Sequence, residues 1–334
     1  MSVYQVTLTG VSKRFAKQLA VDHVDLQLRA GESVALAGHN GAGKSTLLKL
    51  ILGLIHPSEG QVHLMGHETS STAAVAVRKE IGYLPETVSL YPSLTGIEVL
   101  NFFAKLKGQP LEKNQELLSR VGLLGASTRR VRTYSKGMRQ RLALAQAMLG
   151  EPQVLLFDEP TTGLDPASRQ VFYEIVSELR AKGATILLSS HALSEIEAQT
   201  DRIVVMKKGK KIADGTLGEL RVQSELQTRV VLSFESEAAA QALLAQGTQT
   251  AEVQRVGTQT AEPSLAVDQG TVGQGYSQEW RRLDAHRVES YCDEAGKVAK
   301  IQSLAQFQGV NGIDIQSPSL DDIYAHFLRR EDDI

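Results

Sequence analysis

The chain has 334 residues, of which 42% are hydrophobic and 22% charged, and its formal net charge is -2. This length is sufficient for two domains, and the near-neutral charge excludes binding to nucleic acid or an anionic membrane through bulk charge. Cys292 is the single cysteine, which excludes an intrachain disulfide and a paired-cysteine site for zinc, iron–sulfur or redox chemistry.

The N-terminal stretch MSVYQVTLTG lacks the basic segment and apolar run of a signal peptide. No stretch of the sequence approaches the roughly 18 consecutive apolar residues that a membrane-spanning helix needs. We therefore expect a cytoplasmic protein.

The first half of the chain alternates strand and helix patterns. Residues 3–9 alternate in polarity and predict a strand, and residues 24–38 predict two strands around the turn at Ala30 and Gly31. A helix is predicted from Ser45 to Gly53, followed by a mainly helical region over 75–124 that is interrupted at 83–92.

The pattern continues into the middle of the chain. The almost wholly apolar run VLLFDEP at 154–160 is typical of a buried parallel strand. An amphipathic helix over 168–182, a buried strand over 185–190 and two further strands, RIVVM and KIADG, follow. Alternating strands and helices predict an α/β domain with a parallel sheet over residues 1–220.

After Leu220 the composition changes, which predicts a smaller α+β accessory domain over 221–334. The sequence GTQTAE occurs at 247–252 and again at 257–262, within a stretch near 245–275 that we interpret as a mobile loop. Flanking runs at 229–234 and 298–304 predict strands, and DDIYAHFL at 321–328 predicts a closing helix.

The segment from 35 to 53, ALAGHNGAGKSTLLKLILG, places a glycine-rich turn between a strand and a helix. It fits the phosphate-binding pattern G-x-x-x-x-G-K-[ST], in which bare backbone amides and a helix N-terminus cradle phosphates. The lysine of such a loop reaches the β- and γ-phosphates, and the hydroxyl of the next residue binds Mg²⁺. The predicted nucleotide-binding residues are Gly38, His39, Asn40, Gly41, Ala42, Gly43, Lys44, Ser45 and Thr46.

Two acids, Asp158 and Glu159, stand at the carboxyl end of the VLLF strand. An acid at this place can hold Mg²⁺ through water, and its neighbour can orient the attacking water as a general base. The sequence therefore predicts Asp158, with Ser45, as metal ligands and Glu159 as the catalytic base.

Several motifs in a fixed order make residues 3–220 resemble the ATP-binding cassette (ABC) ATPases. YSKGMRQR at 134–141 is similar to the family's signature segment LSGGQ, with Ser135 and Gly137 retained and Tyr134, Lys136 and Met138 differing. TTGLDP is similar to the D-loop and contains Asp165, LLSSH ends in a candidate switch histidine, His191, and Phe15 stands where the family stacks an aromatic ring on adenine. The implied fold is a P-loop NTPase of the ABC type with a helical signature subdomain.

The resemblance also implies a mechanism that needs two copies. Two cassettes pack head to tail as a homodimer, and each ATP with its Mg²⁺ is held between the phosphate loop of one and the signature of the other. Lys44, Glu159 and His191 would carry hydrolysis. Glu86 stands where many members have glutamine, so metal contact is expected to persist while the switching role of that loop is altered.

A single cassette without long coiled-coil arms favours a transporter ATPase. Such an ATPase would dock on an integral membrane permease at the inner face of the bacterial inner membrane. Residues 83–106 are expected to form the docking surface. GHNGAGKST, LILGLIHPSEGQV and GYLPETVSLYP together look like the ATPases of nitrous oxide reductase maturation systems. Such systems pair the ATPase with a permease and a periplasmic partner, and move a sulfur or copper species. The alternative is an exporter of drugs, lipids or polysaccharide. His56, His63 and His67 flank turns and are interpreted as solvated loop residues rather than copper ligands.

Overall fold

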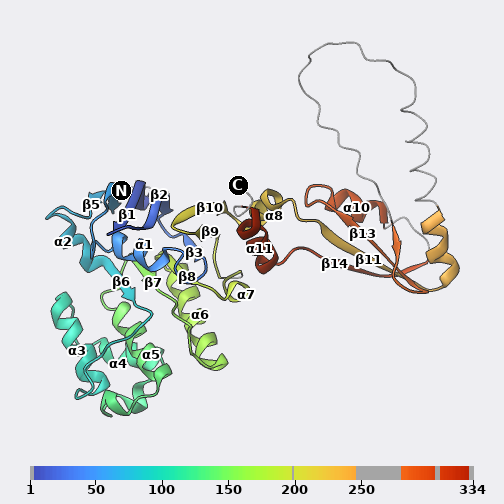
Figure 1. Cartoon of the computed structure of the whole chain (residues 1–334). Helices are drawn as coiled ribbons and strands as arrows, with labels where there is room; N and C mark the ends of the chain where they lie inside the picture. The colour runs from blue at the N-terminus through green and yellow to red at the C-terminus, as the bar shows by residue number, and fades with distance from the viewer. Residues whose placement is uncertain (1–3, 198, 246–279, 305–308, 331–334) are drawn as a thin grey trace, which may run out of the picture. The chain divides into compact units, whose positions relative to one another are not determined.

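The computed structural model describes residues 4–197, 199–245, 280–304 and 309–330. The chain divides into two compact units, one running to Leu217 and including the C-terminal segment from Phe327, the other spanning Gly218–His326. We call them the cassette unit and the accessory unit and describe each by itself (Figure 1). The loop predicted near 245–275, with both GTQTAE copies, lies outside the described residues except for residue 245.

The cassette unit contains an antiparallel sheet of four strands in the order β2-β1-β4-β5. Its strands are β1 (Tyr4–Phe15), β2 (Gln18–Arg29), β4 (Glu59–Leu64) and β5 (His67–Glu68). The strand predicted at 3–9 thus continues to Phe15, because β1 and β2 form a long hairpin that closes with Phe15 opposite Gln18.

The second sheet of this unit has six strands in the order β10-β9-β3-β8-β7-β6. All neighbours are parallel except the edge pair β9 and β10. Its strands are β3 (Ser33–Ala37), β6 (Ile81–Leu84), β7 (Val154–Phe157), β8 (Thr185–Ser190), β9 (Arg202–Lys207) and β10 (Lys210–Gly215). The strand predicted at 185–190 is therefore the direct neighbour of β3, which leads into the glycine-rich turn, and the strand predicted at 154–160 is the next strand along.

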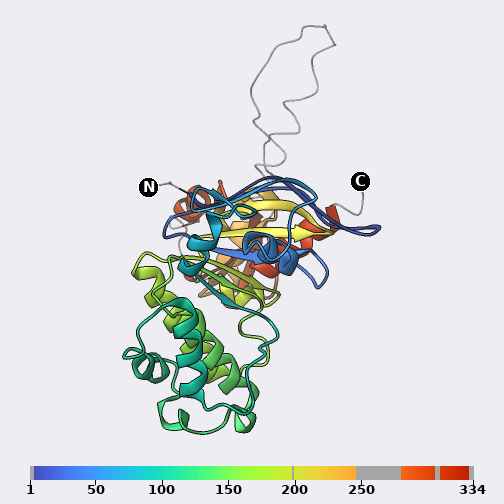
Figure 2. The same ribbon diagram turned by 90° about the vertical axis from the view of Figure 1, so that its left-hand side faces the viewer.

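The helices of the cassette unit follow the predicted order with one correction. They are α1 (Lys44–Ile51), α2 (Ala74–Val77), α3 (Gly96–Lys107), α4 (Asn114–Arg120), α5 (Lys136–Ala147), α6 (Pro166–Ala181) and α7 (Leu193–Ile196), with short 3-10 turns at η1 (Arg78–Glu80), η2 (Leu124–Ala126) and η3 (Val131–Thr133). The region at 75–124 is less helical than predicted, since β6 pairs with β7 and buries Ile81 and Leu84. Figures 1 and 2 show α3, α4 and α5 gathered as a separate helical group beside the sheets.

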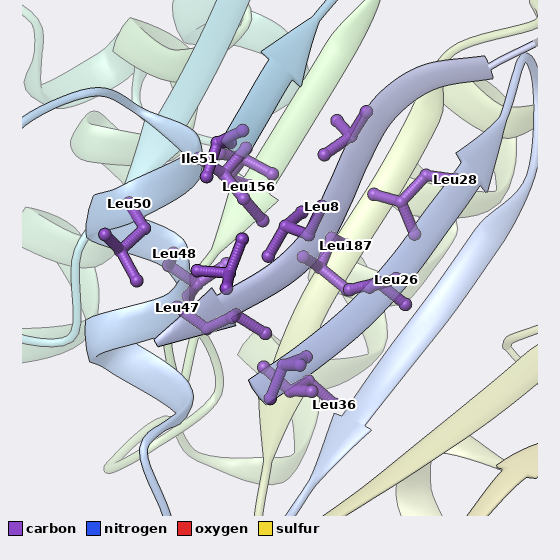
Figure 3. Close-up of a cluster of buried hydrophobic side chains, with 14 of the residues drawn as sticks. Leu8, Leu26, Leu28, Leu36, Leu47, Leu48, Leu50, Ile51, Leu156 and Leu187 are labelled. Atoms are coloured by element: carbon purple, nitrogen blue, oxygen red, sulfur yellow. The ribbon is translucent and has the colours of Figure 1, made fainter. Parts of the chain in front are cut away.

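The core of the cassette unit lies between α1 and the two sheets. Leu47, Leu48 and Ile51 of α1 are fully buried against leucines of the surrounding strands, including Leu8, Leu26, Leu36, Leu156 and Leu187 (Figure 3). This packing fixes α1, and with it the glycine-rich turn at its N-terminus, rigidly on the sheets.

The accessory unit carries a four-stranded antiparallel sheet in the order β12-β13-β11-β14. Its elements are α8 (Leu217–Ser224), β11 (Thr228–Phe234), a helix over 237–245, β12 (Arg281–Arg282), β13 (Arg287–Cys292), α10 (Lys297–Leu304), β14 (Val310–Gln316) and α11 (Leu320–Arg330), whose last residues belong to the cassette unit. The strand–helix–strand–strand–helix–strand order corresponds to the split β-α-β arrangement of ferredoxin-like sheets.

The strand predicted at 298–304 is wrong, because these residues form α10. Val298, Ile301 and Leu304 recur every three residues, and only Leu304 is buried in the accessory core. A seven-residue run of this kind does not separate a strand from a helix by pattern alone.

Candidate active site

The glycine-rich turn links the fully buried strand β3 to α1. Gly43, at the N-cap of α1, has a φ of 103°, and a Cβ at this position would stand 2.5 Å from the carbonyl oxygen of Ala20. No side chain caps this end of the helix, and its first turn carries no acid. The backbone amides at the start of α1 therefore form a site suited to an anion such as phosphate.

Lys44 lies inside this turn and is only 6% exposed. Its ammonium group donates to the carbonyl oxygens of Gly38 and His39, and it lies 3.2 Å from Oε1 of Glu159. The structure thus joins the predicted phosphate-binding lysine to the predicted catalytic base, which come from segments more than a hundred residues apart in the chain.

Asp158 ends β7 and is 3% exposed. Its Oδ1 accepts hydrogen bonds from the hydroxyl of Ser45 at 3.1 Å and from the hydroxyl of Ser189 at 2.8 Å. Ser45 and Asp158 therefore present hard oxygen atoms at one point of the phosphate loop, which fits Mg²⁺. Among the described residues, no group of three or more histidine, cysteine, aspartate or glutamate side chains is placed so that it could hold a metal ion. Mg²⁺ is usually bound by one or two protein carboxylates together with substrate phosphates.

Glu159 and His191 form the next contact. Oε2 of Glu159 lies 2.7 Å from Nδ1 of His191, and the backbone N–H of Glu159 donates to the Ser189 hydroxyl at 2.9 Å. Glu159 has a φ of 47°, in the left-handed region that a residue with a side chain seldom adopts. The carboxylate is buried and oriented from both sides, as a positioned base requires.

A cavity of about 370 Å³ opens over these groups. Its lining combines the turn with residues from distant segments, namely Phe15, Gln18, Ala20, His39, Asn40, Gly41, Gly43, Lys44, Ser45, Thr46, Glu86 and Glu159. Phe15 is 47% exposed at its mouth, and the ammonium group of Lys13 lies 5.2 Å from the ring centroid. One cavity therefore contains both an exposed aromatic ring, which can stack on a base, and the loop that can bind phosphates. A nucleotide needs both.

Glu86 lines this cavity from the loop after β6, beside the phosphate loop. Burial raises the pKa of the nearby Tyr83 to about 12, and the negative charges of Asp158 and Glu86 add to the shift. Tyr83 therefore stays a neutral phenol at physiological pH.

A second set of predicted residues lies away from this cavity. Ser135 caps α5 by accepting a hydrogen bond from the N–H of Met138, and Asp165 caps α6 by accepting from the N–H and hydroxyl of Ser168. These bonds lower the pKa of Asp165. A Cβ at Gly137 would lie 4.0 Å from Oδ2 of Asp165, so the signature segment and the loop at 161–165 are in contact with each other.

Ser189 is a site residue that sequence reasoning missed. Its fully buried hydroxyl connects both acids, since it donates to Asp158 and accepts from the backbone N–H of Glu159. The available signal was the pair of serines that ends the otherwise apolar run TILLSS immediately before His191.

Known proteins resemble this chain in sequence and in fold. The model of the ABC transporter family matches residues 21–162. A Nod factor export ATP-binding protein I of Burkholderia orbicola is 36% identical over 244 residues, which cover 72% of this chain and 80% of the relative. The chain belongs to the ATP-binding proteins of the ABC transporter family. As a member of this family it binds ATP and hydrolyses it.

Further relatives extend the comparison to solved structures. The ABC transporter ATP-binding protein NatA of Bacillus subtilis is 39% identical over 225 residues, which cover 64% of this chain and 91% of the relative. An ATP-binding subunit of an ABC transporter matches with a TM-score of 0.61 at 35% identity, covering 66% of this chain and 92% of that one. The dimeric cassette MJ0796, bound to ADP and phosphate, matches with a TM-score of 0.60 at 26% identity, covering 64% and 98%. These likenesses confirm the predicted ABC ATPase fold.

None of the helices in the described part of the chain combines the length and the apolar character that are needed to cross a bilayer.

Proposed function

We propose that this ATPase subunit powers membrane transport as one of two copies that close around ATP. The observation that carries the proposal is the division of the predicted nucleotide-binding residues. Lys44, Glu86 and Glu159 meet at one cavity, whereas the signature segment and Asp165 lie elsewhere in the cassette unit. A head-to-tail pair of copies would bring the second set to the first, and the dimeric structure of the similar cassette MJ0796 supports a pair of copies.

Within each copy, ATP would rearrange the charged contacts of the cavity. Lys44 is paired with Glu159 at 3.2 Å, and β- and γ-phosphates would compete for its ammonium group. Glu159 would then be released toward the attacking water while His191 holds its other oxygen atom. Ser45 and Asp158 would hold Mg²⁺, which supplies positive charge to the phosphates during transfer.

The membrane subunit would dock on an exposed aromatic patch between β6 and the end of α3. Tyr91 is 51% and Phe102 is 38% exposed, and their rings stack edge to face with a centroid distance of 5.4 Å. Phe103 packs edge-on to Phe102, and Leu106 is 64% exposed. We call Leu90, Tyr91, Phe102, Phe103 and Leu106 the aromatic patch. A single face of this composition is typical of a surface that another protein covers, and its partner would be a permease in the bacterial inner membrane.

For the cargo, we propose a sulfur or copper species needed for the copper–sulfur site of nitrous oxide reductase, with a periplasmic partner reached through the permease. The support is the resemblance of three sequence motifs, GHNGAGKST, LILGLIHPSEGQV and GYLPETVSLYP, to those of the ATPases of nitrous oxide reductase maturation systems. The second candidate is export of a drug, lipid or polysaccharide, which the similarity to a Nod factor export ATP-binding protein favours.

The cargo is tested in cells that produce nitrous oxide reductase. Deleting the gene for this chain should leave the reductase with an unloaded copper–sulfur site, and the wild-type chain should restore it while Lys44→Ala should not. The absorption spectrum of the purified reductase reports the loading. A fully loaded reductase in the deletion strain would contradict the maturation role, and loss of an exported compound there would establish the second candidate.

A further inference from the structure

Lys136 stands between the two signature residues that the chain shares with its family, Ser135 and Gly137. It is the first residue of α5 and is exposed to solvent. The usual signature wording has a glycine here, which would offer no side chain. Lys136 therefore adds a flexible positive charge at the centre of the segment.

The lysine side chain is seated on the loop that carries Asp165. A Cβ at Gly163 would lie 2.3 Å from Nζ of Lys136, 2.9 Å from Cε and 3.2 Å from Cδ. Gly163 also has a φ of 76°. The terminal half of Lys136 thus lies directly over bare backbone, and the glycine leaves room for it.

This seat holds the ammonium group without neutralising it. Within the described part of the chain, no ion pair engages Lys136, and the nearby Asp165 carboxylate is occupied by both hydrogen bonds from Ser168. Some other cations of the cassette unit are paired, such as Arg120 with Glu178 and Arg169 with Glu195. Lys136 is consequently a positioned charge available to an anion from outside its own chain.

We propose that the Lys136 ammonium group binds the triphosphate held by the phosphate loop of a second copy of this chain. The inference rests on the proposed head-to-tail dimer, in which Ser135 and Gly137 face that triphosphate. Lys136 would add one charge-assisted contact to the γ-phosphate, and its seat on Gly163 would link this contact to the loop at 161–165. ATP would be favoured over ADP as the ligand that joins the copies.

The first test measures ATP-induced association in the Glu159→Gln background, in which bound ATP persists. Lys136→Gln should weaken the association roughly 10–100-fold, the usual loss for a charge-assisted hydrogen bond. Lys136→Arg should retain most of it, and the difference between Lys136 and Lys136→Gln should shrink at high salt. Unchanged association of Lys136→Gln would overturn the inference.

A second test separates contact across the dimer from an effect inside one chain. Two copies carrying different fluorescent proteins report only mixed pairs by energy transfer. In the proposed dimer, each site combines Lys44 of one copy with Lys136 of the other copy. With Lys44→Ala in one copy and Lys136→Gln in the other, both substitutions fall in the same site, so one complete site remains. With both substitutions in the same copy, each site has lost one residue, so no complete site remains. The first mixture should associate about 10–100-fold more tightly with ATP, and the reverse order would show that Lys136 acts within its own chain.

The two proposals fail in distinguishable ways. If the Glu159→Gln chain with native Lys136 does not associate in ATP, the proposed dimer itself is wrong. If it associates and Lys136→Gln associates equally well, only the role of Lys136 is wrong.

Discussion

At the scale of single residues, the phosphate loop depends on one buried cation. Replacing Lys44 by alanine removes the charge aimed at the β- and γ-phosphates and leaves Glu159 buried without its cation. Binding of ATP and its hydrolysis should both fall at least tenfold, by analogy with other charged hydrogen bonds. Calorimetric titration with ATP measures the first and phosphate release the second.

Lys49→Ala is the matched control for this substitution, because Lys49 lies on the same helix and is exposed. The control should bind and hydrolyse ATP like the wild type. A Lys44→Ala protein with wild-type turnover would show that the nucleotide lies elsewhere.

Ser189 gives a second prediction at this scale. Ser189→Ala removes the hydrogen bonds that orient Asp158 and Glu159, and hydrolysis should slow by about 10–100-fold while ATP binding changes little. Ser190 is the adjacent buried serine, and its hydroxyl donates to the carbonyl oxygen of Ala192 and accepts from the N–H of Ala192. Ser190→Ala should therefore slow hydrolysis much less. Equal hydrolysis rates in the two variants would show that Ser189 does not position Asp158 and Glu159 for hydrolysis.

Residues of the site differed in how far the sequence could predict them. Lys44 and Ser45 stand in a contiguous pattern whose chemistry depends on local spacing, so they were predictable. Ser189 acts only because β7 and β8 are neighbours in the parallel register, which places its hydroxyl opposite Asp158 and Glu159. That pairing is tertiary, and the sequence of one strand does not contain it.

At the scale of elements, the aromatic patch makes the docking proposal testable. Replacing Leu90 and Tyr91 together by aspartate puts charge on the patch without touching the cavity that holds Lys44. Co-purification with the co-expressed permease should be lost, while ATP binding should remain. Loss of ATP binding would instead show that these side chains support the fold.

Leu54→Asp is the control for that experiment, because Leu54 is 64% exposed in the same unit and lies outside the patch. It should leave co-purification intact. Equal loss with Leu54→Asp would mean that added negative charge, rather than the patch, disrupts the complex.

The accessory unit has its own core, which predicts that it can be weakened separately. Leu232 of β11 is fully buried in a cluster against which Trp280, the single tryptophan, packs. Leu232→Ala should lower stability by roughly 2–5 kcal/mol, seen as an earlier shift of Trp280 emission in a urea titration. Ser233 is the neighbouring, half-buried residue, so Ser233→Ala should shift the unfolding transition much less. If Leu232→Ala left the transition unchanged, Leu232 would not contribute to a core of the accessory unit.

Elements were predicted well where their pattern was long or bounded by strong signals. α6 ends as the sequence suggested and begins just before the predicted start, with Asp165 and Pro166 marking its N-terminus. β6 and α10 were not recognised, because a four-residue strand at a sheet edge and a seven-residue periodic run both depend on the surface that they pack against.

At the scale of the whole molecule, the predicted nucleotide-binding residues of one chain lie in two separate places. The predicted boundary near residue 220 and the contact boundary at Leu217 both leave the phosphate loop and the signature in the same unit. Even so, the signature segment does not line the cavity that contains Lys44. The proposed head-to-tail pair of copies would complete each site.

The most direct test is the mass in solution of the Glu159→Gln protein with ATP and Mg²⁺. Removing the general base should slow hydrolysis by about 10²–10⁴-fold, so the ATP-bound state should accumulate. Light scattering should then give twice the mass of one chain, while ADP, or ATP with Glu159→Gln and Lys44→Ala combined, should give the mass of one. A Glu159→Gln protein that binds ATP and still has the mass of a single chain would contradict the account.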